Sequence, residues 1–391
     1  MTAIKLALRN LIGAGLRTWL SVAVLAVILI LVIWQYAIID GWDRMAVRDM
    51  IDWEIGGGQI WTGEYDPFDP FTLEDSHKAI PGSFNEEIAN GKVAPILITQ
   101  ASIYPGGNIM SILLKGIDTR QQVSKLPTGK LTEESEDIPA IIASTMARDT
   151  RLNIGDYITV RWRDVDGTFD ATEVKIVDVF RCDVPAVSNG QMWVPLDKLQ
   201  EMTQMPGEAT LLVLDQDYKW EGDLEKGWIL RDHEFLLKEM NEMIRMKKVG
   251  GSIFYIILML LAMLAIFDTQ VLSIFRRQKE IGTYMAMGMT RSQVVRLFTI
   301  EGAMHSILAV TLGAIPGIPF LYWMAQKGYA MPAGSDSMGL PIADTIYPAY
   351  SVGLILSVMM LVVITTTIVS YLPSRKISKM NPTEAIKGKL Q

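Results

Sequence analysis

Residue types that carry chemistry are sparse in this chain. The histidines His77, His233 and His305 lie far apart, and none belongs to a paired metal motif, so we expect no zinc site. No Gly-x-x-x-x-Gly-Lys-Ser/Thr phosphate loop occurs, and the glycine run at 56–58 lacks the lysine that should follow it. No Gly-x-Ser-x-Gly nucleophile motif occurs either. We therefore predict no catalytic residue, no metal and no cofactor bound by this chain itself.

One acidic cluster raises the question of a metal. The run EYDPFDPFTLED at 64–75 offers the carboxylate oxygens that Ca²⁺ prefers. Its two prolines and its lack of a loop glycine fit no calcium-binding loop, so calcium binding stays a minor alternative. The single cysteine, Cys182, forms no internal disulfide, so the region around it must fold by its core.

Long apolar runs give the chain its organisation. Four of them are long enough to cross a membrane, at 19–39, 253–274, 303–324 and 350–372. The hydrophilic insert at 40–248 is large enough to fold by itself. We predict an α-helical membrane protein with four transmembrane helices per chain and a large mixed α/β extracytoplasmic domain inserted between the first and second spans. The remaining segments are an amphipathic helix on the cytoplasmic face at 1–18, a cytoplasmic segment at 275–302, an external loop at 325–349 and a cytoplasmic tail at 373–391.

Basic residues near the span ends predict the orientation, because they resist translocation. They gather before the first span, between the second and third spans, and after the fourth, whereas the loop at 325–349 holds only Lys327. Both termini and the segment at 275–302 should therefore be cytoplasmic, which leaves the insert periplasmic or extracellular. We expect a multi-pass protein of the cytoplasmic (inner) membrane.

The insert is acidic, with 37 acidic against 22 basic residues at 40–248. This charge argues against binding of nucleic acid, and the basic cytoplasmic side favours anionic lipid or an acidic protein partner. Turn residues separate short β-rich runs, which predicts a mixed α/β fold. The predicted strands lie at 59–61, 93–98, 110–117, 140–143, 157–162, 172–179, 191–194 and 210–214. One helix should begin at Pro195, and another, at 145–152, should end in a left-handed cap at Asn153 and Gly155.

The cytoplasmic segment between the second and third spans reads RRQKEIGTYMAMGMTRSQVVRLFTIEG. We interpret it as a short helix with Glu280 in its first turn, followed by a helix that Thr290 caps. Gly282 and Gly288 permit tight turns or close approach of a partner. A short helix held rigidly between two spans passes a partner's motion into the bilayer. From these residues alone, an ordinary basic loop is an equal alternative.

This segment resembles the EIG…ALG-A-T-R signature of FtsX-like ABC transporter permeases, the class with LolC/LolE-like and MacB-like proteins. The carboxyl-terminal PSRKISKMNPTEAIKG at 373–388 and the amino-terminal LALRNLIGAGLRTWLS at 6–21 are similar to the family's closing and opening segments. Inside the insert, LLKGIDTRQQ, IIASTMARDTRLNIGDYITV and QMWVPLDKLQEM look most like the lipoprotein-releasing LolC/LolE-like branch. The resemblance covers nearly the whole chain.

The resemblance implies a dimer of permeases, formed with a second copy or a paralogue, in which each permease docks to a separate ATPase subunit that binds ATP and Mg. It also implies a coupling helix that enters the ATPase cleft. Met285 departs from the pattern, because the family commonly has a basic residue there. The residues expected in or beside the coupling helix are Glu280, Ile281, Gly282, Met287, Gly288, Thr290 and Arg291.

The shape suits movement of an amphiphile, such as a lipoprotein or lipid-like molecule, from the outer leaflet towards a periplasmic or extracellular acceptor. Burying acyl chains is worth about 0.8 kcal/mol per methylene, so the cargo needs an apolar route. A cavity between the first and second spans of two protomers supplies one, although the same residues also suit plain packing. Its candidate lining residues are Val24, Ile28, Val32, Phe254, Ile257 and Leu261.

Two other functions stay open. One is MacB-like export of an antibiotic or peptide captured outside the membrane. The other is cargo-free mechanotransmission to an external enzyme, as in FtsX-like proteins proper, whose external domain is usually smaller than this insert.

Asp268 is the one ionised residue inside the predicted spans, about 9 Å along a helix from the cytoplasmic end. The family more often has a neutral polar residue there. We expect Asp268 to pair with Arg17 or with the partner permease, or to lie in a wet crevice. Of the possible roles, we favour structural pairing over proton coupling.

Overall fold

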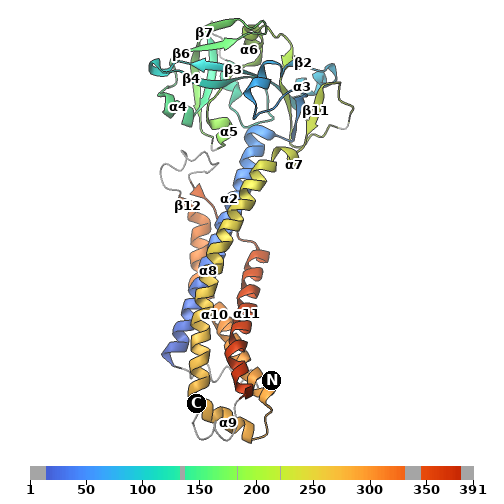
Figure 1. Cartoon of the computed structure of the whole chain (residues 1–391). Coiled ribbons are helices and arrows are strands. Elements are labelled where there is room, and N and C mark those ends of the chain that lie inside the picture. The colour runs from blue at the N-terminus through green and yellow to red at the C-terminus, as the bar shows by residue number, and fades with distance from the viewer. Residues whose placement is uncertain (1–14, 133–136, 183, 221, 331–344, 380–391) are drawn as a thin grey trace. The chain divides into compact units, whose positions relative to one another are not determined.

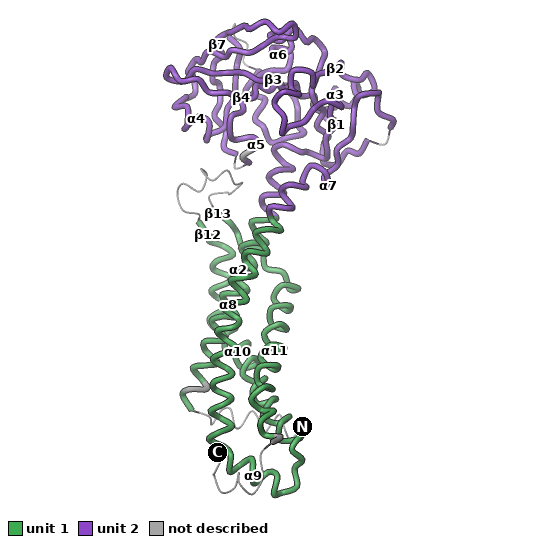
Figure 2. The backbone as a smooth tube through the Cα atoms, in the orientation of Figure 1, with its two compact units in different colours: residues 1–43, 244–330, 345–391 green, residues 44–243, 331–344 purple. Residues whose placement is uncertain are grey.

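The computed structural model describes residues 15–132, 137–182, 184–220, 222–330 and 345–379. The chain divides into two compact units (Figure 2). We call the described residues at 15–43, 244–330 and 345–379 the helical unit, and the described residues at 44–243 the insert unit. The predicted amphipathic helix at 1–18, up to residue 14, and the predicted tail from residue 380 onward lie outside the described residues.

Four helices in the described part of the chain are long and apolar enough to cross a membrane, which confirms the predicted fold class. Three of them extend well beyond the predicted spans, because more polar residues continue the helical pattern at 40–50, 238–252 and 291–302. A short helix, α9, follows α8 (Figure 1). A 3₁₀ helix, η7, follows α11. The elements are α2 (Leu16–Met50), α8 (Lys238–Arg276), α9 (Gln278–Ala286), α10 (Arg291–Lys327), β12 (Tyr329–Ala330), β13 (Thr345–Ile346), α11 (Val352–Ser374) and the 3₁₀ helix η7 (Arg375–Lys379).

Small residues let the long helices of the helical unit approach closely. A Cβ at Gly313 would lie 3.1 Å from the Ala26 side chain, and one at Gly317 would lie 3.0 Å from Ile30. This Gly-x-x-x-Gly spacing on α10 brings its backbone near α2, as in other membrane helix pairs. A core of apolar side chains from α2, α8, α10 and α11 fills the space between the helices, including Val22, Leu25, Leu29, Val32, Ala262, Ile266, Ala309, Val358 and Val362.

The insert unit is built on a nine-stranded sheet that closes on itself. Its strand order is β11-β1-β10-β3-β4-β8-β5-β7-β6, and β3 also pairs with β6. The six strands from β3 to β6 therefore form a closed barrel, and β10, β1 and β11 extend the sheet from β3 (Figure 1). The strands are β1 (Gly58–Thr62), β3 (Val93–Ile103), β4 (Met110–Ile117), β5 (Ile138–Ala143), β6 (Tyr157–Arg163), β7 (Phe169–Phe180), β8 (Gln191–Pro195), β10 (Leu211–Leu214) and β11 (Trp228–Arg231), with a separate pair, β2 (Lys78–Ala79) and β9 (Glu208–Ala209).

Short helices connect the strands of the insert unit. They are the π-helix η1 (Ile51–Ile55), the 3₁₀ helices η2 (Pro70–Glu74), η3 (Gly82–Phe84), η4 (Pro105–Gly107) and η5 (Thr128–Thr132), and the α-helices α3 (Asn85–Ala89), α4 (Ser144–Thr150), α5 (Pro185–Ser188), α6 (Leu196–Thr203) and α7 (His233–Leu236).

Strand β3 is buried on both faces. Leu97, Ala101 and Ile103 pack in one apolar core, whereas Ile96 and Ile98 pack in another. Successive side chains of a strand point to opposite faces, so a strand between two cores reads as a continuous apolar run. This explains why VAPILI at 93–98 shows no alternation of apolar and polar residues.

All eight predicted strands are present in the insert unit. The short strands β2, β9 and β11 of that unit were not predicted, and neither were β12 and β13 of the helical unit. Helix α6 follows Pro195, whose φ of −58° suits a helix start. The predicted cap of α4 is wrong: the residue after this helix, Arg151, is left-handed (φ 58°) and its N–H donates to Ala147 O. The N–H of Asn153 instead donates to Asp156 Oδ2, at 2.8 Å, in the following turn.

Candidate ATPase-coupling site

One arginine connects α9 to the first turns of α10. Arg277 is the N-cap residue of α9, directly after α8. Its Nε donates to Glu280 Oε2 at 2.7 Å, and its Nη1 donates to Glu301 Oε1 at 2.6 Å. Its guanidinium also lies 4.9 Å from the centroid of the Phe298 ring. The start of α9 is therefore fixed against the first turns of α10 by charge-assisted hydrogen bonds.

The Arg277–Glu301 pair is largely shielded from solvent. The side chains of Arg277 and Glu301 are 18% and 7% exposed. Burial acts to lower the pKa of Arg277, but the charge of Glu301 and the hydrogen bonds to Glu280 and Glu301 outweigh it, so the pKa is raised. Loss of a charge-assisted hydrogen bond at this depth is costly, so the pair should hold α9 firmly.

An apolar core of its own supports the inner side of α9. Ile281 is fully buried, and Gly282 beside it is buried as well. The absence of a side chain at Gly282 keeps this side of α9 flat. Ile281 packs with side chains from α8, α10 and η7, namely Ile274, Val294, Val295, Phe298 and Ile377.

A tight turn connects α9 to α10. Met287 ends α9, and Gly288 adopts φ +94°, a conformation that glycine reaches without strain. Thr290 then caps α10 in a capping box: its Oγ1 accepts from Gln293 N at 3.3 Å, and Gln293 Oε1 accepts from Thr290 N at 2.8 Å. The turn geometry is thus specified by local hydrogen bonds.

The seven residues predicted to contact an ATPase divide into two groups. Glu280, Met287, Gly288, Thr290 and Arg291 are exposed, and Met287 keeps 68% of its surface accessible. Ile281 and Gly282 are buried and position the helix instead of presenting a surface.

Sequence reasoning missed the positioning role of Arg277 and Glu301. Arg277 counted only as one of the basic residues that flank a span. The available signal was the glutamate itself, since Glu301 lies close to the start of an apolar run and needs a partner there.

The six predicted cavity residues are not brought together within one chain. Ile28 and Val32 pack in the core of the helical unit, in agreement with the packing alternative. The other four keep between 41% and 57% of their surface exposed, and they are Val24, Phe254, Ile257 and Leu261.

Asp268 is exposed on α8 and makes no ion pair with any described residue. The side chain of Arg17, one predicted partner, lies outside the described part of the chain.

The acidic run at 64–75 uses several carboxylates for local structure. Asp66 Oδ1 accepts from Phe68 N at 2.9 Å, and Asp69 Oδ1 accepts from Phe71 N at 3.0 Å. Glu74 pairs with Arg163 at 2.6 Å. Among the described residues, no group of three or more His, Cys, Asp or Glu side chains is arranged to hold a metal ion.

Comparisons with known proteins address the helical unit directly. The family model described as FtsX-like permease C-terminal matches residues 252–382, which include the greater part of α8 and all of α9, α10 and α11. Among solved structures, the chain is similar to the extracellular domain of the noncanonic ABC-type transporter YknZ from Gram-positive bacteria, at 13% identity and a TM-score of 0.25. That match covers 41% of this chain and 83% of that chain. A comparison with curated proteins finds no match. Residues 252–382 are therefore similar to the C-terminal domain of FtsX-like permeases.

Proposed function

We propose that this permease couples ATP hydrolysis by a separate ATPase subunit to the extraction or export of a lipoprotein or lipid-like amphiphile from the outer leaflet of the cytoplasmic membrane. The observation that carries the proposal is the construction of α9. Its inner side is anchored in a dedicated core by Ile281 and by Arg277, and its outer side and following turn are exposed.

This construction suits the transmission of force. The Arg277–Glu301 ion pair and the α9 core join α9 to α10, and Ile274 and Ile377 add contacts from α8 and η7. A push on the exposed face of α9 therefore displaces three membrane helices together and is not absorbed by a flexible loop. The exposed side chains of Glu280 and Arg291 provide polar contacts, and Met287 provides an adaptable apolar one.

The family supports the remaining parts of the proposal. The ATPase partner holds ATP and Mg, the permease pairs with a second copy or a paralogue, and both termini with α9 face the cytoplasm. The large insert then faces the periplasm or the cell exterior, where an acceptor collects the cargo. Exposed apolar side chains at Val24, Phe254, Ile257 and Leu261 supply surface for acyl chains or for the second permease.

A test of the coupling site replaces one exposed methionine. Met287→Glu places a new charge on the proposed ATPase contact, and we expect the permease to lose at least ten-fold in copurification of the ATPase encoded beside it. Met246→Glu is the matched control, because Met246 is 71% exposed on α8, distant in sequence from α9. Equal retention of the ATPase by both variants would show that α9 is not the contact.

The cargo is tested separately. Photo-crosslinking of the intact transporter in cells, followed by mass spectrometry, should recover lipidated proteins or lipids. Recovery of antibiotics or peptides alone would favour the MacB-like alternative. ATPase activity that responds to an external hydrolase but to no lipid or peptide would favour mechanotransmission.

A further inference from the structure

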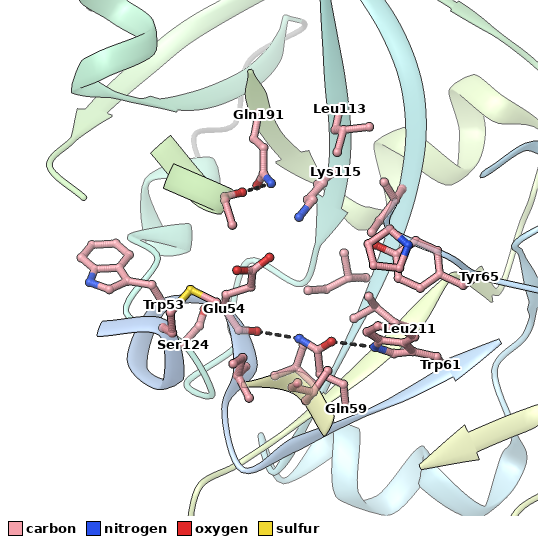
Figure 3. A pocket seen from close by; sticks show the side chains of 18 of the residues that line it. Trp53, Glu54, Gln59, Trp61, Tyr65, Leu113, Lys115, Ser124, Gln191 and Leu211 are labelled. Atoms are coloured by element: carbon pink, nitrogen blue, oxygen red, sulfur yellow. Dashed lines mark hydrogen bonds between the residues drawn. The ribbon is translucent and has the colours of Figure 1, made fainter. Parts of the chain in front are cut away.

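The insert unit contains a cavity of about 850 Å³, all of whose lining residues belong to that unit. Ligand pockets in proteins have volumes of about 300–1,000 Å³, so this one has room for a small organic molecule. Its walls are mostly aromatic and aliphatic (Figure 3). The lining includes Trp53, Trp61, Tyr65, Leu113, Trp193 and Leu211.

Two oppositely charged side chains point toward each other in this apolar cavity (Figure 3). Lys115, on β4, is 6% exposed, and its Nζ lies 4.9 Å from the centroid of the Trp193 ring. Glu54, in the π-helix η1, has its Oε2 buried without a hydrogen-bond partner among the described residues. The two side chains form no direct ion pair in the described structure, although their charges interact. The Glu54 carboxyl group and the Lys115 amino group are therefore separated by a space within the cavity.

This arrangement is unfavourable for the charged forms of both groups. Burial raises the pKa of Glu54 and lowers the pKa of Lys115, and the attraction between them only partly opposes this. Burial of a charge without a hydrogen-bonded partner is costly. Other polar atoms lining the cavity also lack a hydrogen-bond partner among the described residues, namely Gln191 Oε1, Trp193 Nε1 and Ser124 Oγ. A ligand with matching polar groups would satisfy these atoms.

The chain holds Glu54 in position. The main-chain oxygen of Glu54 accepts from Gln59 Nε2 at 2.8 Å, and Gln59 Oε1 accepts from Trp61 Nε1 at 2.7 Å (Figure 3). On the same π-helix, Asp52 Oδ2 pairs with Lys125 Nζ at 2.7 Å, which fixes the turn. Single π-helical turns are rare and frequently lie at functional sites.

The mouth of the cavity is apolar as well. The run at 64–75, which was the minor calcium candidate, contributes Tyr65, Phe68 and Leu73 to the lining, and Phe235 lies beside them. Phe68 and Phe235 are 71% and 46% exposed. An exposed aromatic rim around a pocket with a charged interior suits a molecule that is apolar along most of its length and polar at one end.

We infer that this cavity binds a single amphiphile with a zwitterionic head, whose ammonium group lies at Glu54, whose acidic group lies at Lys115, and whose apolar body packs on the tryptophan-lined walls. The opposite charges of Glu54 and Lys115 select a head of zero net charge over an anionic or a cationic one. This inference is independent of the transport function, because the whole site lies in the insert unit and needs no ATPase.

The test uses the full chain in nanodiscs of phosphatidylglycerol, without an ATPase. The probe is lysophosphatidylethanolamine, a zwitterionic single-chain lipid, with a photoactivatable diazirine on its acyl chain. We expect labelled peptides from β4 and β8, the strands that carry Lys115 and Trp193. Unlabelled lysophosphatidylethanolamine should compete at least ten-fold better than lysophosphatidylglycerol with the same chain.

Two variants test the site itself. The double variant Glu54→Gln/Lys115→Met removes both charges without leaving one unpaired, and should lose at least ten-fold in labelling. Glu86→Gln/Lys130→Met makes the same changes at exposed positions and should label like the natural chain. Leu113→Trp fills the cavity and should abolish labelling while both charges remain, which provides a second variant if the double variant misfolds.

Three results would overturn the inference. Labelling confined to the membrane helices would show that the probe only partitions into the bilayer. Equal competition by the two lysolipids would remove the role of the charges. Full labelling of a folded double variant would mean that Glu54 and Lys115 are a structural pair only. None of these results bears on ATPase binding at α9, so failure here is distinguishable from failure of the proposed function.

Discussion

At the scale of single residues, oppositely charged side chains from different elements define both candidate sites. The Arg277–Glu301 ion pair fixes α9, and the charges of Glu54 and Lys115 give the cavity its polarity. Sequence reasoning found Thr290 as a cap because a cap depends on residues a few positions away. It missed these two combinations of charges because each depends on how distant elements pack, which one sequence does not specify.

Arg277→Met should uncouple the permease. The substitution keeps an unbranched side chain but removes the guanidinium from the Phe298 ring and from the buried Glu301 carboxylate, which costs about 3 kcal/mol. We expect ATPase binding at α9 to persist while cargo-stimulated ATPase activity falls at least ten-fold, measured on the reconstituted complex. Arg276→Met, at the exposed neighbouring position, is the control and should behave like the natural chain. Normal stimulation in the Arg277 variant would contradict a positioning role.

Asp52 should make the insert unit sensitive to acid. Burial acts to raise the pKa of Asp52, but hydrogen bonds from Lys125 and Gln216 and the charges of Lys125 and Arg48 lower it overall, below the ordinary value of 3.8. A carboxyl with a lowered folded-state pKa stabilises the fold above its unfolded-state pKa, and this stabilisation is lost as the pH falls through the folded-state pKa. The melting temperature of the full chain, measured between pH 7 and about pH 2, should therefore decrease once the pH is below 3.8.

The Asp52→Asn variant separates this effect from general acid unfolding. It should melt lower than the natural chain at pH 7 and lose less stability on acidification. Asp223→Asn, at an exposed position, should follow the natural chain throughout. If the melting temperatures of the natural chain and the Asp52 variant decreased in parallel with falling pH, Asp52 would not be the source of the acid sensitivity.

At the scale of elements, periodicity predicted which segments form helices and strands but not how they join. Strand β4 was predicted with its observed bounds, after the turn residues at 105–108, whereas β3 and β7 are longer than predicted. The pairing of β3 with β6, which closes the barrel, leaves no mark in either strand's own sequence. Helix α2 was predicted too short because only its apolar stretch was counted.

Gly41 is the one glycine of α2, and its replacement should be destabilising. A Cβ there would lie 2.0 Å from the main-chain oxygen of Tyr347, which cannot rotate away. The nearby segment is held to α2 by a hydrogen bond from Ala349 N to Ala37 O at 2.8 Å. We expect Gly41→Ala to lower the melting temperature of the purified chain by several degrees, equivalent to a loss of about 2 kcal/mol.

Gly353→Ala is the matched comparison for Gly41→Ala. No heavy atom outside its own helix lies within 4 Å of a Cβ at Gly353, on α11. Alanine favours a helix over glycine by about 0.5–1 kcal/mol, so this variant should be neutral or more stable. An equal loss in both variants would mean that backbone flexibility, and not contact with Tyr347, limits these positions.

At the scale of the whole molecule, exposed apolar side chains form the surfaces that a membrane or a second copy would cover. The chain supplies many such side chains on α2 and α8, and lipid or a second copy must cover them in a membrane. The sequence placed several of these residues in a cavity between two protomers. A single sequence cannot separate lipid-facing from partner-facing positions, because both are apolar.

Cysteine crosslinking tests the predicted dimer. Leu261→Cys on α8 should give a disulfide-linked dimer in oxidised membranes, whereas Ile315→Cys on α10 should stay monomeric, although Leu261 and Ile315 are 57% and 71% exposed. Cys182 is buried in the insert unit and does not compete for the oxidant. Dimer from Ile315→Cys alone would place the second copy against a different face.

Sheet order also dictates when the insert unit can fold during synthesis. Gly58, at the start of β1, pairs with Leu214, and β1 has β11 as its other neighbour. Strand β1 therefore stays without its two sheet neighbours until β10 and β11 have been synthesised. Nascent chains that end before β10 should be protease-sensitive at β1, and chaperones that shield β1 during this delay should raise the yield of the folded chain.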